Sequence, residues 1–308
     1  MRAVAMTSFG GPEVLSVVEI PTPEPEAGQV RVRVAAATVN NFDLVARAGR
    51  LGGMLPAGPR YVLGWDVAGE IDAVAPDVTG FAPGDAVIGM SDWLDTKAGT
   101  YAEYVVLNAA SVTRAPAGAT PLQAATIPVN GLTALRILEL LDPAPGATIA
   151  VTGAGGAVGG YTAELAAGRG HRVLAVASAQ DEAFLTGLGA TFVPRSDDPV
   201  AALRAHAPDG VDALVDAATI GPEMIAAVRD GGAYAGLTPP KTPEPERGIS
   251  VHRVHVTADG ARLAELVSLA EQGRFTLRVA QDFPFEQAPQ AHAMLAKGGV
   301  RGRVLLTP

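Results

Sequence analysis

The 308-residue chain contains no cysteine. That absence excludes disulfides, thiolate nucleophiles, and every zinc or iron–sulfur site that depends on cysteine. Basic residues are also scarce, since 23 Lys and Arg stand against 32 Asp and Glu, which gives a net charge of −9. No run of Lys or Arg occurs, so nucleic acid and anionic membranes are not expected as partners.

The sequence is also expected to lack long apolar runs. We expect no segment to reach the roughly 20 apolar residues that span a bilayer, and the first residues lack the apolar centre of a secretion signal. A cytoplasmic protein is therefore expected. Hydrophobic residues make up 48% of the sequence and charged residues 18%, which favours packed globular domains, and the length predicts two of them.

The first third of the chain predicts a small, strongly curved sheet or partial barrel. Residues 29–39 alternate in polarity, residues 67–89 hold short apolar runs between Pro and Gly turns, and residues 99–107 predict one more strand. After about residue 121, strand patterns alternate with helix patterns. That alternation is typical of βαβ units and a parallel sheet.

Three later segments carry specific expectations. Residues 222–232 predict a helix, and residues 249–256 predict an edge strand that is exposed for pairing. Pairing of this strand with a second copy predicts a homodimer. The closing strand at 301–308 is expected to return to the first domain.

The stretch VTGAGGAVGG (151–160) places Gly153, Gly156 and Gly159 three residues apart, between a buried-strand pattern and a helix pattern. In that context, backbone N–H groups and the positive end of a helix can approach a pyrophosphate. The spacing departs from GxGxxG because Val158 holds the last glycine position. A tight turn without a ligand is the alternative, but the surrounding βα units favour a dinucleotide.

The end of the next strand bears on the choice of dinucleotide. A carboxylate there binds the ribose 2′-OH of NAD, whereas Ala177 and Ser178 stand at the predicted tip. This favours NADP(H), although Asp181 and Glu182 would repel a 2′-phosphate if they pointed inward. Arg195, after the following strand, is either the partner of the 2′-phosphate or a solvated loop residue.

Eight segments follow one another in a specific order: VRVAAATVNNFDLVARAG, GWDVAGEI, FAPGDAVIG, GTYAEYVV, PVNGLTA, VTGAGGAVGG, GLGA and RGRVLL. In this order and spacing they resemble the medium-chain dehydrogenase/reductase superfamily, in particular its zinc-free quinone oxidoreductase branch. The resemblance covers essentially the whole chain. It implies an α/β protein with a GroES-like partial β-barrel domain (1–120 and 263–308), an NADP(H)-binding Rossmann domain (121–262), and an active-site cleft between them.

The resemblance also bears on zinc. Members that act as alcohol dehydrogenases hold a catalytic zinc through a Cys and a His, and Asn40 and Trp65 stand at those two positions here. All five histidines lie outside residues 1–120, the segment that holds these two positions, so no His/Cys set is expected there. The expected chemistry is therefore metal-free hydride transfer from NADPH to a quinone or to the β-carbon of an enone.

The resemblance places four candidate catalytic residues in the first domain. Asn40 is expected near the nicotinamide, where its amide donates a hydrogen bond, and Asp43 lines the same pocket. For Asn40 the alternative is a role in stabilising a turn, and for Asp43 it is a purely structural role. Tyr61 and Trp65 are further pocket candidates whose alternative is core packing.

No tyrosine follows the VNNFD segment (39–43) within the next few residues, which leaves the proton donor open, and Trp93 is a candidate stacking surface. The predicted cofactor contacts, including those expected at the carboxyl ends of the parallel strands, are Asn40, Thr133, Gly153, Gly155, Gly156, Ala157, Val158, Gly159, Ser178, Arg195, Ala217, Ala218, Gly236, Leu237 and Thr238.

Two other functions remain open from the sequence. An enoyl reductase for a biosynthetic thioester shares the fold and the hydride chemistry, but no basic patch for an acidic carrier protein is present. A catalytically silent NADPH-binding protein predicts nucleotide binding without turnover on any acceptor.

Overall fold

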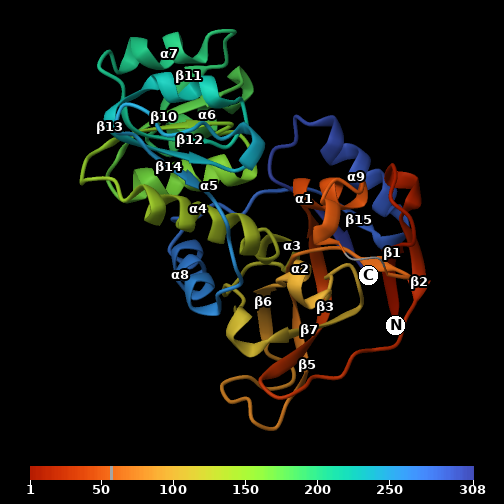
Figure 1. The fold of residues 1–308 in the computed structure, drawn as a ribbon. Helices are drawn as coiled ribbons and strands as arrows, with labels where there is room; N and C mark the ends of the chain where they lie inside the picture. The colour runs from red at the N-terminus through yellow and green to blue at the C-terminus, as the bar shows by residue number, and fades with distance from the viewer. Residues whose placement is uncertain (56–57) are drawn as a thin grey trace. The chain divides into compact units, whose positions relative to one another are not determined.

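The computed structural model describes residues 1–55 and 58–308, and its contacts divide the chain into two compact units (Figure 1). Unit 1 comprises residues 1–129 and 257–308, and unit 2 comprises residues 130–256. These boundaries lie nine residues after (129 − 120) and six residues before (262 − 256) the ones that the sequence predicts. Helix α4 (Pro128–Leu141) runs without a break across the first boundary.

Unit 1 contains a seven-stranded sheet in which β15-β16-β3-β5-β6-β8 are neighbours and β7 also pairs with β3, together with a three-stranded sheet, β2-β1-β4. The buried and exposed residues of β3 alternate along its first half, as the period of two requires. Strand β16 pairs antiparallel with β3, so the chain end returns to this unit as predicted. The strands and helices of unit 1 are β1 (Arg2–Met6), β2 (Ser16–Glu19), β3 (Gln29–Val39), α1 (Asn41–Arg47), β4 (Tyr61–Val62), β5 (Asp66–Val74), β6 (Ala86–Met90), α2 (Trp93–Thr96), β7 (Tyr104–Asn108), β8 (Val112–Arg114), α3 (Pro121–Ala124), α8 (Gly260–Glu271), β15 (Val279–Pro284), α9 (Ala288–Lys297) and β16 (Arg303–Thr307).

Unit 2 is a six-stranded, fully parallel sheet in the order β11-β10-β9-β12-β13-β14. Numbered within the unit, this is 3-2-1-4-5-6, the order of a doubly wound dinucleotide-binding sheet. Helices α5 and α7 lie on opposite faces of it (Figure 1), so its central strands are buried on both sides. Its elements, besides α4, are β9 (Thr148–Thr152), α5 (Ala157–Gly168), β10 (Arg172–Ala177), α6 (Glu182–Gly187), β11 (Thr191–Pro194), α7 (Pro199–His206), β12 (Val211–Asp216), β13 (Val228–Gly236) and β14 (Ser250–Arg253).

The predicted α/β fold class is confirmed, but three local predictions need correction. The helix expected at 222–232 is only a 3-10 turn (Pro222–Ala227), because β13 begins at Val228 and pairs with β12. The strand expected at 99–107 is shorter and begins at Tyr104. The edge strand expected at 249–256 is β14, which covers Ser250–Arg253 and stands last in the sheet.

The expectation about apolar length was wrong for residues 121–141. This 21-residue stretch, which contains α3 and α4, has the length and composition to cross a membrane, with a mean hydropathy of 1.3. Within the fold, 78% of the apolar window is buried. Such burial is typical of a core helix, whose apolar residues pack against other parts of the protein.

Candidate functional site

The carboxyl edge of the parallel sheet carries the glycine turn. Strand β9 ends at Thr152, and helix α5 begins at Ala157 with Gly156 as its N-cap. Because β9 lies between β10 and β12, the turn stands where the strand order reverses, which is where doubly wound sheets bind their ligands.

Two glycines fix the shape of this turn. Gly153 has a φ of +62°, a conformation that side chains disfavour. A Cβ on Gly159 would lie 2.3 Å from the carbonyl oxygen of Gly153, so α5 packs on the turn at a distance that glycine alone permits. This contact explains why the third glycine stands at 159 rather than at 158. The bare backbone and the N-terminus of α5, a helix of twelve residues, fit a pyrophosphate.

Most of the other predicted cofactor residues of unit 2 lie at the same edge. Ser178 follows β10, Arg195 follows β11, Ala217 and Ala218 follow β12, and Gly236 ends β13 with Leu237 and Thr238 directly after it. Thr133 is a buried residue of α4. The structure therefore assembles one strand-end surface from segments that are far apart in sequence.

Asp216 is a residue of this edge that sequence reasoning missed. Its buried carboxylate accepts hydrogen bonds from Thr152 Oγ1 (2.7 Å) and from the backbone N–H groups of Ile220 and Gly221, each at 3.1 Å. Tyr234 donates a further bond to it at 3.2 Å. Asp216 thus holds the loop after β12 in place, and its position at the end of an apolar strand was the only signal in the sequence.

Asp181 lies against the glycine turn. Its side chain is only 6% exposed, and it accepts a hydrogen bond from Ser178 Oγ at 2.6 Å. A Cβ on Gly155 would lie 2.4 Å from Asp181 Oδ2. The carboxylate is therefore turned inward against the glycine turn, whereas Arg195 is exposed and its backbone N–H donates to Ala177 O at 2.8 Å.

In unit 1, the predicted catalytic Asn40 belongs to a cluster of four buried polar side chains. Thr38, Asn40, Asp66 and Arg303 are each at most 8% exposed. Asp66 Oδ2 accepts hydrogen bonds from Asn40 Nδ2 and from Arg303 Nη2, both at 2.9 Å, and a third from the Thr38 hydroxyl. Arg303 Nη2 also donates to Asn40 Oδ1 at 2.8 Å. We call these residues the Asn40 cluster.

The Asn40 cluster joins three separate strand ends. Thr38 and Asn40 come from the end of β3, Asp66 begins β5, and Arg303 begins β16. Of the four, sequence reasoning singled out only Asn40. Asp66 and Arg303 were within segments that carried the family resemblance, but their pairing across 237 residues left no local signal.

Asp43 is fully buried and accepts hydrogen bonds from backbone N–H groups near the Asn40 cluster. Its Oδ2 accepts from Asn40 N (2.8 Å) and from the Tyr101 hydroxyl (3.0 Å), and its Oδ1 accepts from Gly64 N (3.3 Å). Burial raises the pKa of Asp43 to about 7, and these three hydrogen bonds oppose that rise. Asp43 therefore links the start of α1 to the backbone that precedes Trp65.

His292 lies beyond Tyr101, edge-on to its ring at 5.8 Å between centroids. Its side chain is fully buried, and neither imidazole nitrogen has a hydrogen-bond partner in the described part of the chain. Burial, together with the nearby Arg47 guanidinium, lowers the pKa of His292 to about 3. This imidazole is therefore neutral at physiological pH.

The three aromatic candidates, Tyr61, Trp65 and Trp93, differ in the residues that surround them. Tyr61 stacks on Phe9, and its hydroxyl accepts from Gly58 N at 3.0 Å. Trp65 packs between Phe42 and Trp93, and its Nε1 has no hydrogen-bond partner within residues 1–55 and 58–308. Trp93 is 1% exposed and donates from Nε1 to Val62 O, so the suggested stacking surface is a core residue.

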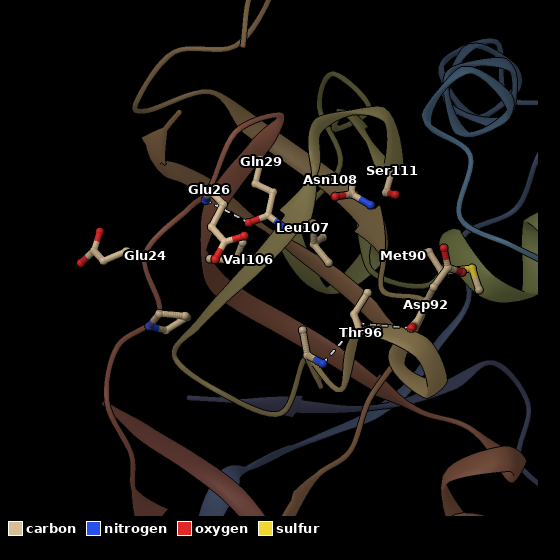
Figure 2. Close-up of a pocket in the computed structure, with 12 residues that line it drawn as sticks. Glu24, Glu26, Gln29, Met90, Asp92, Thr96, Val106, Leu107, Asn108 and Ser111 are labelled. Carbon is tan, nitrogen blue, oxygen red and sulfur yellow. Dashed lines mark hydrogen bonds between the residues drawn. The ribbon is translucent and has the colours of Figure 1, made fainter. Parts of the chain in front are cut away.

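A separate hollow of about 270 Å³ lies in unit 1 between residues 23–29, the loop before α2 and the end of β7. Figure 2 shows Glu24 and Glu26 on one side of it and Asp92 and Thr96 on the other. None of its lining residues belongs to the predicted site.

Known protein families match segments of both units. The alcohol dehydrogenase GroES-like domain family matches residues 26–117, and the zinc-binding dehydrogenase family matches residues 188–306. A solved NAD-dependent alcohol dehydrogenase shares 33% sequence identity with a TM-score of 0.88, and the alignment covers all of both chains. The chain belongs to the medium-chain dehydrogenase/reductase superfamily.

Two other relatives within this superfamily are similar over the full chain. A chloroplastic quinone oxidoreductase of Triphysaria versicolor is 27% identical over 100% of this chain and 98% of its own length. A 2-methylene-furan-3-one reductase of Solanum lycopersicum is 28% identical over 100% of this chain and 79% of its own length. The chain is thus a member of a superfamily of pyridine-nucleotide oxidoreductases.

The zinc implied by the name of one matched family does not fit the residues of this member. Asn40 and Trp65 offer an amide and an indole where a zinc site needs thiolate or imidazole. The amide oxygen of Asn40 is already bonded to Arg303. Among the described residues, no group of three or more His, Asp or Glu side chains is arranged to hold a metal.

Proposed function

We propose that this protein is an NADPH-dependent, zinc-independent oxidoreductase that transfers hydride to a quinone or to the β-carbon of an α,β-unsaturated carbonyl. The observation that carries the proposal is the Asn40 cluster, in which an amide stands where zinc members have a metal ligand and is hydrogen-bonded by a buried guanidinium. The names of the quinone oxidoreductase and furanone reductase relatives support the two acceptor classes.

The chain's contribution to this reaction is binding and electrostatics. The glycine turn and the N-terminus of α5 hold the dinucleotide by its pyrophosphate, and the bound nicotinamide supplies the hydride. As hydride reaches the acceptor carbon, negative charge develops on the acceptor's carbonyl oxygen. Hydrogen-bond donors that are already in place stabilise that charge, and Asn40 Nδ2 is the donor that we assign to this role.

We propose that water supplies the proton. The Tyr101 hydroxyl is buried and donates to Asp43, and Asp43 is itself fully enclosed. The Tyr61 hydroxyl accepts from Gly58. The Tyr101 hydroxyl therefore offers no proton to a solvent-borne substrate without first breaking its bond to Asp43, and Asp43 is shielded from solvent.

The proposed preference for NADPH rests on two residues with opposite effects. Arg195 emerges next to Ala177 at the tip of β10, where it can attract a 2′-phosphate. Asp181 presents a carboxylate to the same edge and repels one. We expect Asp181→Asn to raise the ratio of kcat/KM for NADPH to that for NADH by about tenfold, which corresponds to about 1.4 kcal/mol, and Arg195→Ala to lower it.

Steady-state kinetics with both nucleotides measures these ratios. Glu182→Gln is the matched control, because it removes an exposed carboxylate one residue away and is expected to leave the ratio within about twofold. An unchanged ratio in both Asp181→Asn and Arg195→Ala would contradict the proposed 2′-phosphate site.

We also propose a homodimer that forms through β14. This strand ends the unit 2 sheet, so its outer N–H and C=O groups are available to a second copy. Sedimentation velocity is expected to show a dimer for the natural chain and a monomer for Val251→Pro, which introduces a residue that cannot donate at the edge. A variant that sediments like the natural chain would contradict this assignment.

The function itself is tested by following NADPH and NADH oxidation with quinones, enones and enoyl thioesters, with and without EDTA. Turnover of a quinone or an enone that EDTA leaves unchanged supports the proposal. Tight nucleotide binding without turnover of any acceptor would instead favour a silent binding protein.

A further inference from the structure

One nitrogen of Arg303 donates hydrogen bonds to the three other members of the Asn40 cluster. Its Nη2 donates to Asn40 Oδ1 at 2.8 Å, to Asp66 Oδ2 at 2.9 Å and to the Thr38 hydroxyl. The guanidinium is 5% exposed, and its Nε has no partner in the part of the chain that the structure describes. A buried arginine that uses one nitrogen for three acceptors both neutralises Asp66 and fixes the groups around it.

The effect on Asn40 is to select one of two amide orientations. Its Oδ1 faces the guanidinium, so its Nδ2 faces Asp66 Oδ2 (2.9 Å), with Thr38 Oγ1 farther away at 3.4 Å. Thr38 and Asp66 are hydrogen-bonded neighbours, so both lie on the same side of the amide nitrogen. The two hydrogens of that nitrogen point about 120° apart, and one of them is left without an acceptor among the described residues.

We propose that Arg303 is a positioning residue for hydride transfer: it holds the Asn40 amide so that its remaining N–H points toward the carbonyl oxygen of the acceptor. This inference rests on the proposed function. Without Arg303 the amide can turn over and place its oxygen where the developing negative charge needs a donor. The guanidinium thereby orients the group that stands at a metal-ligand position of the zinc-containing relatives.

The first test is kinetic. Arg303→Met alone leaves Asp66 as an uncompensated buried charge, so the informative variant is the neutral pair Asp66→Asn/Arg303→Met. We expect its kcat to fall by about tenfold to a hundredfold with a much smaller change in the KM for NADPH. Arg303→Lys, which keeps the charge, is expected to recover part of kcat. Arg301→Met, two residues away and exposed, is the control and is expected to match the natural chain.

A double-mutant cycle separates positioning from general damage. In an Asn40→Ala background the neutral pair is expected to cost little further kcat, because the group that Arg303 positions is already gone. An additive loss, or a kcat of the neutral pair equal to that of the natural chain, would overturn the inference.

The second test needs no turnover. The chain has four asparagines, so selective ¹⁵N-asparagine labelling gives four side-chain amide signals, and the Asn40→Ala variant assigns one of them. We expect the Asn40 signal to be shifted and protected from hydrogen exchange in the natural chain and in Arg301→Met, and to lose both properties in the neutral pair. An unchanged signal would overturn the role of Arg303. Absence of turnover in the natural chain would count against the proposed function alone.

Discussion

Gly159→Ala is expected to destabilise unit 2 and to weaken dinucleotide binding together. The added methyl group would lie 2.3 Å from Gly153 O and 3.1 Å from Ala154 Cα, both of which belong to the backbone and cannot rotate away. Helix α5 must therefore shift from the glycine turn. Overpacking of this kind costs about 1–3 kcal/mol of folding free energy, and the displaced N–H groups should raise the Kd for NADPH at least about tenfold.

Thermal unfolding and calorimetric titration with NADPH measure the two effects. Gly187→Ala is the matched control, because it adds the same methyl group at a helical glycine where no atom lies within 4 Å. That variant is expected to be neutral or slightly stabilising, by up to about 1 kcal/mol. If Gly159→Ala bound NADPH as tightly as the natural chain, the glycine turn would not be the phosphate site.

His292→Leu is expected to make the protein more stable in acid. The folded pKa of His292 is about 3, far below its unfolded value, so the unfolded chain takes up a proton that the folded chain refuses. The natural protein therefore loses about 1.4 kcal/mol of stability per pH unit from this residue as pH falls below about 6.5. Because neither nitrogen of His292 has a described partner, an apolar side chain of similar size loses no hydrogen bond there.

Asp43 contributes a pH dependence of opposite sign. Its folded pKa of about 7 lies above the unfolded value of 3.8, so the folded chain binds the extra proton between these values. Its contribution to stability is present below about pH 4 and is lost as pH rises toward 7. Between about pH 4 and 6.5 the contributions of the two residues to the pH dependence of stability offset one another. Replacing either residue therefore leaves the pH dependence of the other uncompensated.

Urea unfolding at a series of pH values tests this pair. Relative to the natural chain, His292→Leu is expected to gain about 3 kcal/mol on going from neutral pH to about pH 4. Asp43→Asn is expected to show the opposite trend, becoming less stable relative to the natural chain as pH falls. Parallel curves for all three proteins would contradict the assigned protonation states.

Features set by nearby residues were predictable from the sequence. The glycine turn depends on a strand, three glycines and a helix that follow one another within 151–168, and the structure has the turn between strand β9 and helix α5 as expected. The edge position of β14 was also predictable, because a short polar strand follows a loop rich in Pro and charge. The turn of residues 222–227 was misread, since apolar spacing alone does not distinguish a helix from buried 3-10 residues beside a strand.

The Asn40 cluster was only partly predictable. The resemblance pointed to Asn40, but its partner Arg303 is 263 residues away and its partner Asp66 is 26 away. Which buried charges neutralise one another depends on how β3, β5 and β16 come together, and no local pattern encodes that. The same limit applies to Asp181, whose inward orientation depends on the packing of residues 178–181 against Gly155.

The most direct test of the central claim is to supply NADPH that carries deuterium at the transferable position, together with an α,β-unsaturated ketone and EDTA, and to analyse the product by mass spectrometry and NMR. We expect deuterium at the β-carbon of a saturated ketone, a hydrogen from water at the α-carbon, and a yield that the chelator leaves unchanged. Nucleotide that binds but never transfers deuterium to the ketone or to a quinone, or transfer that stops when EDTA is added, would contradict it.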